Sequence, residues 1–359
     1  MTGPPAGGPP SPAGQTAPPG PVRRWVLGAR PRTFAAAIVP VVVGTAIGWY
    51  QRSVGAIGYG CASFDGHARC VPSGFVPPFR LWSTQLVSGP GVVIWWRAIC
   101  ALIVALAVQI GTNYANDYAD GVRGTDERRV GPVRLVASGL ASPAAVKRAV
   151  YLSFVVAAAA GLGLAAATTW WLVPIGAACF LAGWLYTGGP KPYGYIGLGE
   201  LFVFLFFGVV ATVGSAYVQT GSLWSSGPGL SSSALFVSLL ALWASIAVGL
   251  LATALLEANN LRDIAGDTVA AKKTLAVRLG RHRGGWLYVG SLIGVAVGVV
   301  LVALVRPWAL LALLAVPLAV PPCRLALSDA EGRELLPMLG ATGRLQLVVG
   351  ALLTLGILL

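Results

Sequence analysis

Long apolar runs recur from residue 33 to residue 359, and they constrain the fold more than any other feature. Only 10% of the 359 residues are charged, against about 25% in soluble domains. A helix rises about 1.5 Å per residue, so a run of about 17 residues or more can cross a bilayer. Nine such runs predict an all-α integral membrane protein with nine transmembrane helices. They cover residues 33–50, 92–113, 144–166, 170–186, 196–218, 234–257, 284–305, 308–325 and 343–359.

The distribution of basic residues predicts the orientation. If the N-terminus is cytoplasmic, 20 of the 25 Lys and Arg residues lie on the cytoplasmic side. Because cytoplasmic loops are enriched in Lys and Arg, we expect a multi-pass protein of the cell (plasma) membrane with a cytoplasmic N-terminus and an external C-terminus. The same rule and the anionic lipid headgroups explain the net charge of +13 better than a nucleic-acid partner does.

Two regions stand apart from the apolar runs. Residues 1–22 are rich in Pro and Gly, which predicts a disordered cytoplasmic leader before a single domain at 23–359. Residues 51–91 form a long polar insertion that we expect on the outer side. The insertion contains Cys61 and Cys70. Outside the cytoplasm we expect a disulfide between them, with two free thiols as the alternative.

Acidic residues gather in two short segments after the second and sixth runs. Asn116 and Asp120 are four residues apart, as are Asp263 and Asp267, so on a helix each pair shares one face. Carboxylate and amide oxygens suit Mg²⁺, which proteins usually hold together with substrate phosphates. Basic residues flank both segments. Acids and bases at the cytoplasmic mouth of an apolar bundle fit the binding of a lipid diphosphate.

Two other interpretations of these segments are open at this point. Ordinary solvated loops would explain the bases, but not two acidic sets that each follow Asn. A cation-coupled transporter would place its acidic residues near the bilayer midplane in broken helices. Here the acids lie at the cytoplasmic ends of the runs with Lys and Arg beside them, which favours phosphate chemistry.

Five segments resemble the UbiA superfamily of intramembrane aromatic prenyltransferases, and within it the branch that acts on 1,4-dihydroxy-2-naphthoate. The resemblance covers nearly the whole chain from residue 30 onward. The segments are RPRTFAAAIVPVVVGTA (30–46), NYANDYADGVRGTD (113–126), RVGPVRLVASG (129–139), YTGGPKPYGYIGLGE (186–200) and NNLRDIAGDTVAAKKTLAVRLG (259–280). Other UbiA-type acceptors, such as 4-hydroxybenzoate, homogentisate or haem, are the nearest alternatives.

Both metal-binding motifs of the family have counterparts here. The motif NxxxDxxxD is matched at Asn116 and Asp120, and its last position is open between Asp117 and Asp126. The motif DxxxD is matched fully at residues 263 and 267. The 51–91 insertion departs from the short connection that is usual in the family.

The resemblance implies nine helices around a central cavity, with the motifs on cytoplasmic loops. It also implies Mg²⁺, as two ions, and transfer of a prenyl chain from a polyprenyl diphosphate to 1,4-dihydroxy-2-naphthoate. The ring carboxylate leaves as CO₂ and the product is demethylmenaquinol, a step of menaquinone biosynthesis. The implied partners are these two substrates and membrane lipid, with a homo-oligomer left open.

Residue roles follow from the acid–base pattern and the resemblance. The expected catalytic residues are Asp120, Asp263, Lys272 and Arg134. The expected Mg²⁺ ligands are Asn116, Asp117, Asp120, Asp126, Asp263 and Asp267. The expected diphosphate-binding residues are Arg123, Arg128, Arg134, Lys272, Lys273, Asn259 and Asn260. Rings expected to stabilise the allylic cation, unless they only anchor the membrane interface, are Tyr114, Tyr118, Tyr186 and Tyr193. The bases expected to pair with the acceptor carboxylate are Lys191 and Arg134.

Overall fold

A computed structural model describes residues 19–55, 60–64, 67–71, 92–125, 134–221 and 232–359. Within 54–71 and 232–238 it describes only the backbone. The predicted leader falls almost wholly outside these ranges. Its end is described, and helix α1 already begins there, at Pro21.

The described chain is almost entirely helical, as the apolar runs predict. The longer helices are α1 (Pro21–Ala29), α2 (Ala35–Gly55), α3 (Trp95–Arg123), α4 (Pro143–Ala167), α5 (Leu172–Leu185), α7 (Ala211–Thr220), α8 (Ser232–Val269), α9 (Leu275–Ala303), α10 (Val316–Leu327) and α11 (Leu336–Leu358). Shorter helical segments are η1 (Pro31–Thr33), η2 (Tyr193–Ile196), α6 (Gly199–Val203), the π-helix η3 (Phe204–Val210), η4 (Pro307–Ala315) and η5 (Gly332–Leu335).

Every one of the nine apolar runs coincides with helix, but the number of spans is not confirmed as nine. In the described ranges, seven helices are long and apolar enough to cross a membrane. An eighth is gained if Pro21–Thr33 and Ala35–Ser53, which meet at a bend of 55°, form one broken span. Helix α5 corresponds to the run 170–186 but has only 14 residues, too few for a full crossing at about 1.5 Å per residue.

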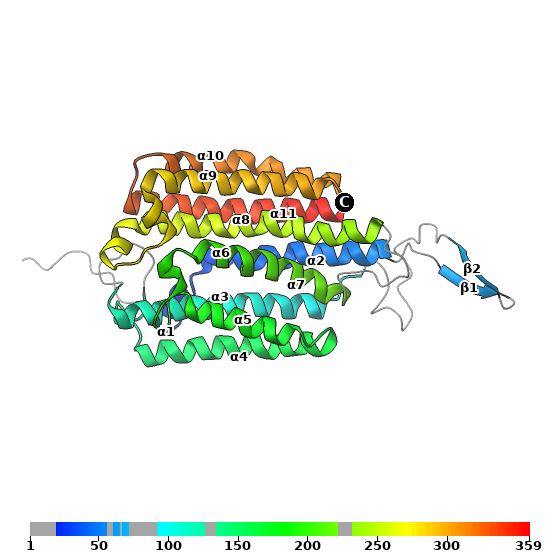
Figure 1. Cartoon of the computed structure of the whole chain (residues 1–359). Helices are drawn as coiled ribbons and strands as arrows, with labels where there is room; N and C mark the ends of the chain where they lie inside the picture. The colour runs from blue at the N-terminus through cyan, green and yellow to red at the C-terminus, as the bar shows by residue number, and fades with distance from the viewer. Residues whose placement is uncertain (1–18, 56–59, 65–66, 72–91, 126–133, 222–231) are drawn as a thin grey trace, which may run out of the picture.

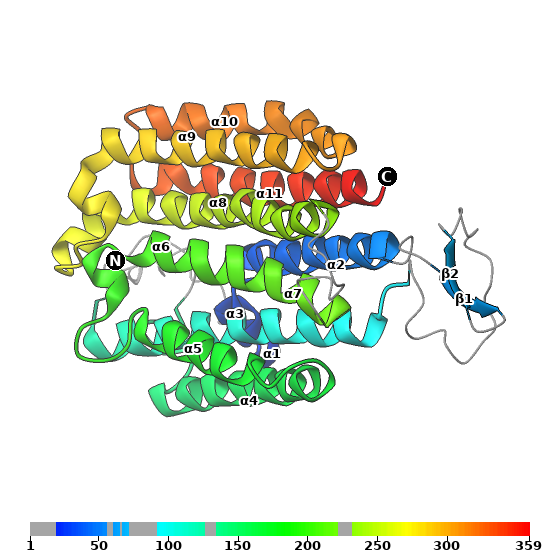
Figure 2. The same ribbon diagram turned by 45° about the vertical axis from the view of Figure 1, so that its right-hand side comes forward.

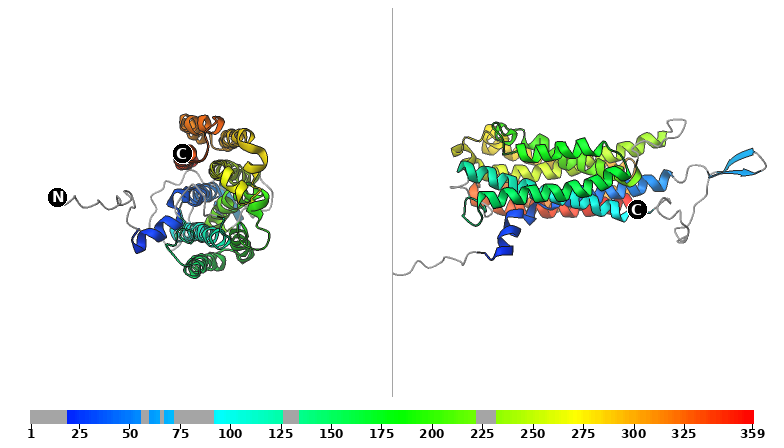
Figure 3. Two further views of the ribbon diagram at one scale, coloured as in Figure 1. Left: turned by 90° about the vertical axis from the view of Figure 1, so that its left-hand side faces the viewer. Right: turned by 90° about the horizontal axis from the view of Figure 1, so that it is seen from below.

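The long helices run side by side in one bundle (Figures 1 and 2). Helices α8 to α11 lie on one side, α3 to α5 on the other, and α2, α6 and α7 between them (Figure 1). Figure 3 shows the same bundle end-on. The pairs in most extensive contact include α8 with α9 and α3 with α4. Gly298 of α9 permits this closeness, because a Cβ there would lie 2.9 Å from the backbone nitrogen of Ala247 in α8.

The insertion contains a two-stranded antiparallel hairpin, β1 (Gly60–Phe64) and β2 (His67–Val71), which the sequence did not lead us to expect. The register places the Cα of Cys61 opposite that of Cys70. Their side chains lie outside the described structure, so the disulfide stays a prediction. The hairpin and the C-terminus lie at the end of the bundle opposite the α8–α9 connection (Figure 1).

The motif residues lie on helices, and the prediction that they occupy loops is wrong for those that the structure describes. The second apolar run ends at residue 113, but α3 continues to Arg123 and ends at Gly124, whose φ of 71° is left-handed. Likewise α8 continues past its apolar run to Val269. The polar turns remain helical because neighbouring segments bury them, so their side chains bond to protein rather than to water.

Candidate active site

A cavity of about 1310 Å³ opens between α2, α3, α4, α5, α7 and α8. Most of its wall is apolar, from Val41 on α2 to Leu164 on α4. Polar side chains gather where the motif-bearing ends of α3 and α8 meet. Those on the wall are Arg30, Arg32, Asn116, Asp120, Arg134, Asn259, Asn260, Arg262, Asp267 and Lys272. The cavity therefore joins an apolar channel to a compact set of charges.

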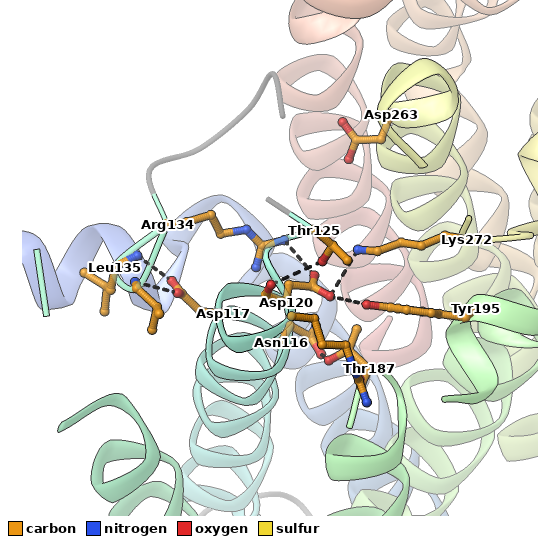
Figure 4. Close-up of polar contacts among 12 residues, drawn as sticks. Asn116, Asp117, Asp120, Thr125, Arg134, Leu135, Thr187, Tyr195, Asp263 and Lys272 are labelled. Carbon is orange, nitrogen blue, oxygen red and sulfur yellow. Dashed lines mark hydrogen bonds and ion pairs between the residues drawn. The ribbon is translucent and has the colours of Figure 1, made fainter. Parts of the chain in front are cut away.

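Asp120, in the last turn of α3, is the centre of the polar end (Figure 4). Its Oδ1 accepts a hydrogen bond from the Tyr195 hydroxyl at 2.6 Å and lies 3.1 Å from Nζ of Lys272. Its Oδ2 lies 3.6 Å from Nη2 of Arg134. The carboxylate is almost completely buried, so these contacts compensate for the hydration that it has lost. Three of the expected catalytic residues are thus in contact, because Lys272 and Arg134 both lie beside Asp120.

Tyr195 contacts the Asp120 carboxylate through its hydroxyl and two basic side chains, Lys272 and Arg123, through its ring. Nζ of Lys272 lies 4.8 Å from the centre of the Tyr195 ring, and the guanidinium of Arg123 lies 5.6 Å from it. Burial raises the pKa of the Tyr195 phenol, and the Asp120 carboxylate raises it further. The hydroxyl therefore keeps its proton and acts as a donor. No acidic or basic pattern marks Tyr195 in the sequence, and it was not among the expected residues.

The other members of the first motif have different surroundings. Oδ1 of Asn116 accepts a hydrogen bond from the Thr187 hydroxyl at 2.8 Å, and Asn116 lines the cavity. Asp117 points to the opposite side of α3 (Figure 4). Its oxygens accept the backbone N–H groups of Leu135 at 2.7 Å and Val136 at 3.0 Å. Asp117 therefore holds the segment that carries Arg134, and it does not line the cavity. Asp126, its alternative, lies outside the described residues, as does Arg128.

The second motif divides in a similar way. Asp267 lines the cavity, as predicted for a metal ligand. Asp263 does not, and its two oxygens are bound by Nε and Nη2 of Arg262 at 2.8 and 2.7 Å. Asn259 and Asn260 are on the cavity wall. In this structure the guanidinium of Arg262 neutralises the Asp263 carboxylate. The expected role of Asp263 as a Mg²⁺ ligand stays a prediction.

Several expected substrate-binding residues are directed elsewhere. Lys273 and Lys191 are exposed to the surroundings and do not line the cavity. The guanidinium of Arg123 donates to the backbone carbonyls of Thr187 and Gly189, which ties the α5–η2 connection to α3. All three side chains are basic, and Arg123 and Lys273 are also near the motifs in sequence, but neither property fixes the direction in which a side chain points.

Comparison with known proteins settles the family. Residues 76–332 match the model of the UbiA prenyltransferase family. The chain belongs to the UbiA prenyltransferase family. It is 43% identical to the 1,4-dihydroxy-2-naphthoate octaprenyltransferase of Mycobacterium tuberculosis, over 90% of this chain and 93% of the relative. It is 35% identical to the Escherichia coli protein of the same name, over 93% of this chain and 95% of the relative.

The solved structure of a UbiA homolog from Archaeoglobus fulgidus has the same fold. It is 11% identical to this chain, with a TM-score of 0.50, and the match covers 93% of this chain and 99% of the homolog. This likeness, with the apolar helices, confirms an integral membrane all-α UbiA fold.

Aromatic rings line the cavity of this UbiA-family chain beyond the polar end. Tyr186 and Tyr193, two of the four expected rings, are on the wall, with centroids 5.5 Å apart. Tyr193 stacks on Phe202 at 4.1 Å, and Phe202 lies 6.0 Å from Phe206. The sequence did not single out these two Phe residues. They face the cavity from the start of the span that contains the π-helix η3.

The other two expected rings are elsewhere. The Tyr114 hydroxyl donates to the carbonyl of Trp25 at 2.9 Å and thereby ties α1 to α3. Tyr118 stacks on Trp184 at a centroid distance of 6.1 Å, with Nζ of Lys147 5.7 Å from the Tyr118 ring. Neither Tyr114 nor Tyr118 lines the cavity. Both rings pack against neighbouring helices, and anchoring at the membrane interface stays a prediction for them.

The donor set of the cavity fits Mg²⁺. Asp120 and Asn116 of α3 and Asp267 and Asn260 of α8 line the cavity with carboxylate and amide groups, whose oxygens are the ligand type that this ion prefers. No three His, Cys, Asp or Glu side chains in the described ranges form a metal cluster on their own. Such a site suits an ion that is held jointly with substrate phosphates rather than by a closed protein cage.

Proposed function

We propose that this chain transfers a polyprenyl group from a polyprenyl diphosphate to 1,4-dihydroxy-2-naphthoate, with loss of the ring carboxylate as CO₂. The named relatives support the choice of reaction and acceptor. The observation that carries the proposal is the contact between Lys272 and Asp120. It brings the segments of both motifs together at the mouth of an apolar cavity, where a diphosphate head can lie with its tail between the helices.

The polar end accounts for cleavage of the allylic C–O bond. That cleavage is costly because diphosphate leaves as an anion, and preorganised positive charge lowers the barrier. Lys272 and Arg134 supply fixed charge on the cavity wall. Mg²⁺, which we propose as two ions held by oxygens of both motifs, would neutralise the remaining charge on the leaving group. Tyr195 holds Asp120 through a hydrogen bond, so the carboxylate keeps its place when substrate enters.

The aromatic wall accounts for the survival of the allylic cation. A cation is stabilised over the face of an aromatic ring and is lost if water reaches it. Tyr186, Tyr193 and Phe202 offer such faces next to the polar end. Burial raises the pKa of Tyr193, so that its phenol stays neutral. The electron-rich acceptor ring then attacks the cation.

The acceptor needs one basic side chain to pair with its carboxylate, and no strong base to remove a proton. Because CO₂ leaves the carbon that is attacked, no ring proton has to be removed there. Of the two bases expected to pair with the acceptor carboxylate, Arg134 is on the cavity wall and Lys191 is exposed. We propose Arg134 for this role. We also propose a plasma-membrane location with the motif end cytoplasmic, and a Cys61–Cys70 disulfide.

The proposed function is tested with purified chain in lipid nanodiscs, Mg²⁺ and radiolabelled polyprenyl diphosphate. We expect prenylated quinol, diphosphate and one CO₂ per turnover only when 1,4-dihydroxy-2-naphthoate is present. Product formation with 4-hydroxybenzoate or homogentisate, and none with the naphthoate, would reassign the acceptor. Absence of diphosphate release with every acceptor would refute prenyl transfer.

A further inference from the structure

Two glutamates within the bundle have no part in the reaction described above. Glu200 lies at the start of α6, and Glu257 lies on α8. Both are buried. Each has one oxygen in a hydrogen bond, and the other oxygen, Oε2, has no hydrogen-bond partner among the described residues. Ionisable side chains at membrane depth are costly and are typically functional, so each needs an explanation.

Glu200 contacts a residue of the cavity wall. Its Oε1 accepts a hydrogen bond from Nδ2 of Asn260 at 2.9 Å. Asn260 is on α8, and it lines the cavity together with Asp267 of the same helix. The contact therefore links α6 to the part of α8 that faces the diphosphate end.

The carboxylate determines which end of the Asn260 amide is available to a ligand. An Asn side chain has one accepting oxygen and one donating NH₂ group. If the amide of Asn260 were reversed, its oxygen would face the oxygens of Glu200, and the two acceptors would repel each other. With NH₂ directed to Glu200, the amide oxygen is the group left for the cavity. An accepting oxygen suits a cation and disfavours a diphosphate oxygen.

We propose that Glu200 is a positioning residue, which fixes the amide of Asn260 so that its oxygen serves as a ligand for Mg²⁺ bound with diphosphate. The proposal rests on the proposed function and extends it. It replaces the expected role of Asn260, which was to bind diphosphate directly. Asn260 thereby joins Asp267 and Asp120 as an oxygen donor that lines the cavity. Hydrogen-bond partners of metal ligands commonly change metal affinity about 10- to 100-fold when removed.

Glu257 is the matched control. It is also a buried carboxyl of the bundle, but its Oε1 accepts from the hydroxyl of Ser291 on α9 at 2.9 Å. Neither Glu257 nor Ser291 lines the cavity. A change at Glu257 alters a buried carboxyl of the bundle and removes a contact with Ser291, not one with Asn260.

The test measures binding of Mn²⁺ with inorganic pyrophosphate to purified full-length chain by electron paramagnetic resonance, without turnover. Glu200→Met removes the acceptor, and we expect an affinity for Mn²⁺ at least about tenfold weaker. Glu200→Gln offers Asn260 either an oxygen or an NH₂ group, so the amide is no longer fixed, and the affinity for Mn²⁺ should lie between those of Glu200→Met and the unmodified chain. Glu257→Gln should also leave the affinity unchanged. Adding Glu200→Met to Asn260→Leu should weaken binding no further than Asn260→Leu alone.

The outcomes separate the two proposals. If the unmodified chain does not bind Mn²⁺ with pyrophosphate, the proposed function fails. If it binds and Glu200→Met binds equally well, positioning by Glu200 is refuted. If Glu200→Met does not fold, as judged by thermal unfolding, Asn260→Leu decides: unchanged Mn²⁺ affinity in that variant would overturn the role of the amide oxygen.

Discussion

Nζ of Lys272 lies 3.1 Å from Oδ1 of Asp120, and this contact joins the two motif segments. Lys272 follows the end of α8, and Asp120 is in the last turn of α3. Both side chains are buried on the cavity wall. The charge pair therefore lies on the part of the cavity wall where we propose that diphosphate and its metal bind.

Replacing Lys272 tests that arrangement. We expect Lys272→Met to lower kcat about 100-fold, because removal of one preorganised group that stabilises developing charge costs this much in other enzymes. The matched control is Lys273→Met, since Lys273 is adjacent but exposed and should retain nearly full activity. Steady-state kinetics with labelled polyprenyl diphosphate measures both. Equal losses in the two variants would mean that overall charge, and not the contact with Asp120, governs the rate.

Asp117 should act on stability rather than on metal binding. Its carboxylate accepts the backbone N–H groups of Leu135 and Val136. Hydrogen bonds to charged groups contribute about 1.5–3 kcal/mol, so Asp117→Ala should destabilise the 134–136 segment by about that amount or more. Asp117→Asn keeps one acceptor and should lose less. Thermal unfolding in detergent measures the loss; an Asp117→Ala variant with unchanged melting temperature but weaker Mg²⁺ activation would show that Asp117 binds metal.

Tyr195 gives a prediction for pH dependence. Burial and the Asp120 carboxylate raise the pKa of Tyr195 above its ordinary value of 10.0, so the phenol retains its proton as the pH rises through 10. Any loss of activity between about pH 8 and 10 therefore does not come from this group. Tyr195→Phe should lower kcat about tenfold by removing the hydrogen bond to Asp120, since one hydrogen bond to a charged group contributes about 1.5 kcal/mol or more.

The control for Tyr195 is the shape of the pH profile. Tyr195→Phe keeps the ring over which Lys272 lies, so the alkaline limb of kcat against pH should be the same in variant and unmodified chain. Disappearance of that limb in the variant would show that the phenol titrates in this range.

The length and apolar character of the runs predicted the helical fold, because each long run buries its side chains in lipid or in the bundle. The helix ends were less predictable. The polar turns from Asn113 to Arg123 look like a loop when hydropathy is the only criterion, but Thr187 and Tyr195 bond to them from another segment and keep them helical. Such contacts depend on tertiary structure, which a single sequence does not display.

Some of the residues that the sequence singled out line the cavity, and their roles stay predictions. Asp120, Asp267 and Lys272 are on the cavity wall as expected. Asp117 looked equally suitable because it directly follows the motif residue Asn116, and sequence position alone gives no side-chain direction; it lies on another face of α3. Tyr195 was missed because its importance comes from its hydrogen bond to Asp120, 75 residues away in the sequence, and such a contact is visible only in the structure.

Removal of metal should stop the reaction without unfolding the site. In the structure Asp120 is held by Lys272, Tyr195 and Arg134, so its position does not depend on a bound ion. We expect EDTA to lower prenyl transfer at least about 100-fold, because Mg²⁺ contributes several kcal/mol by stabilising the leaving diphosphate. The melting temperature in the absence of substrate should stay the same, and added Mg²⁺ should restore the rate. A parallel fall of melting temperature and activity in EDTA would instead mean that the ion holds the fold together.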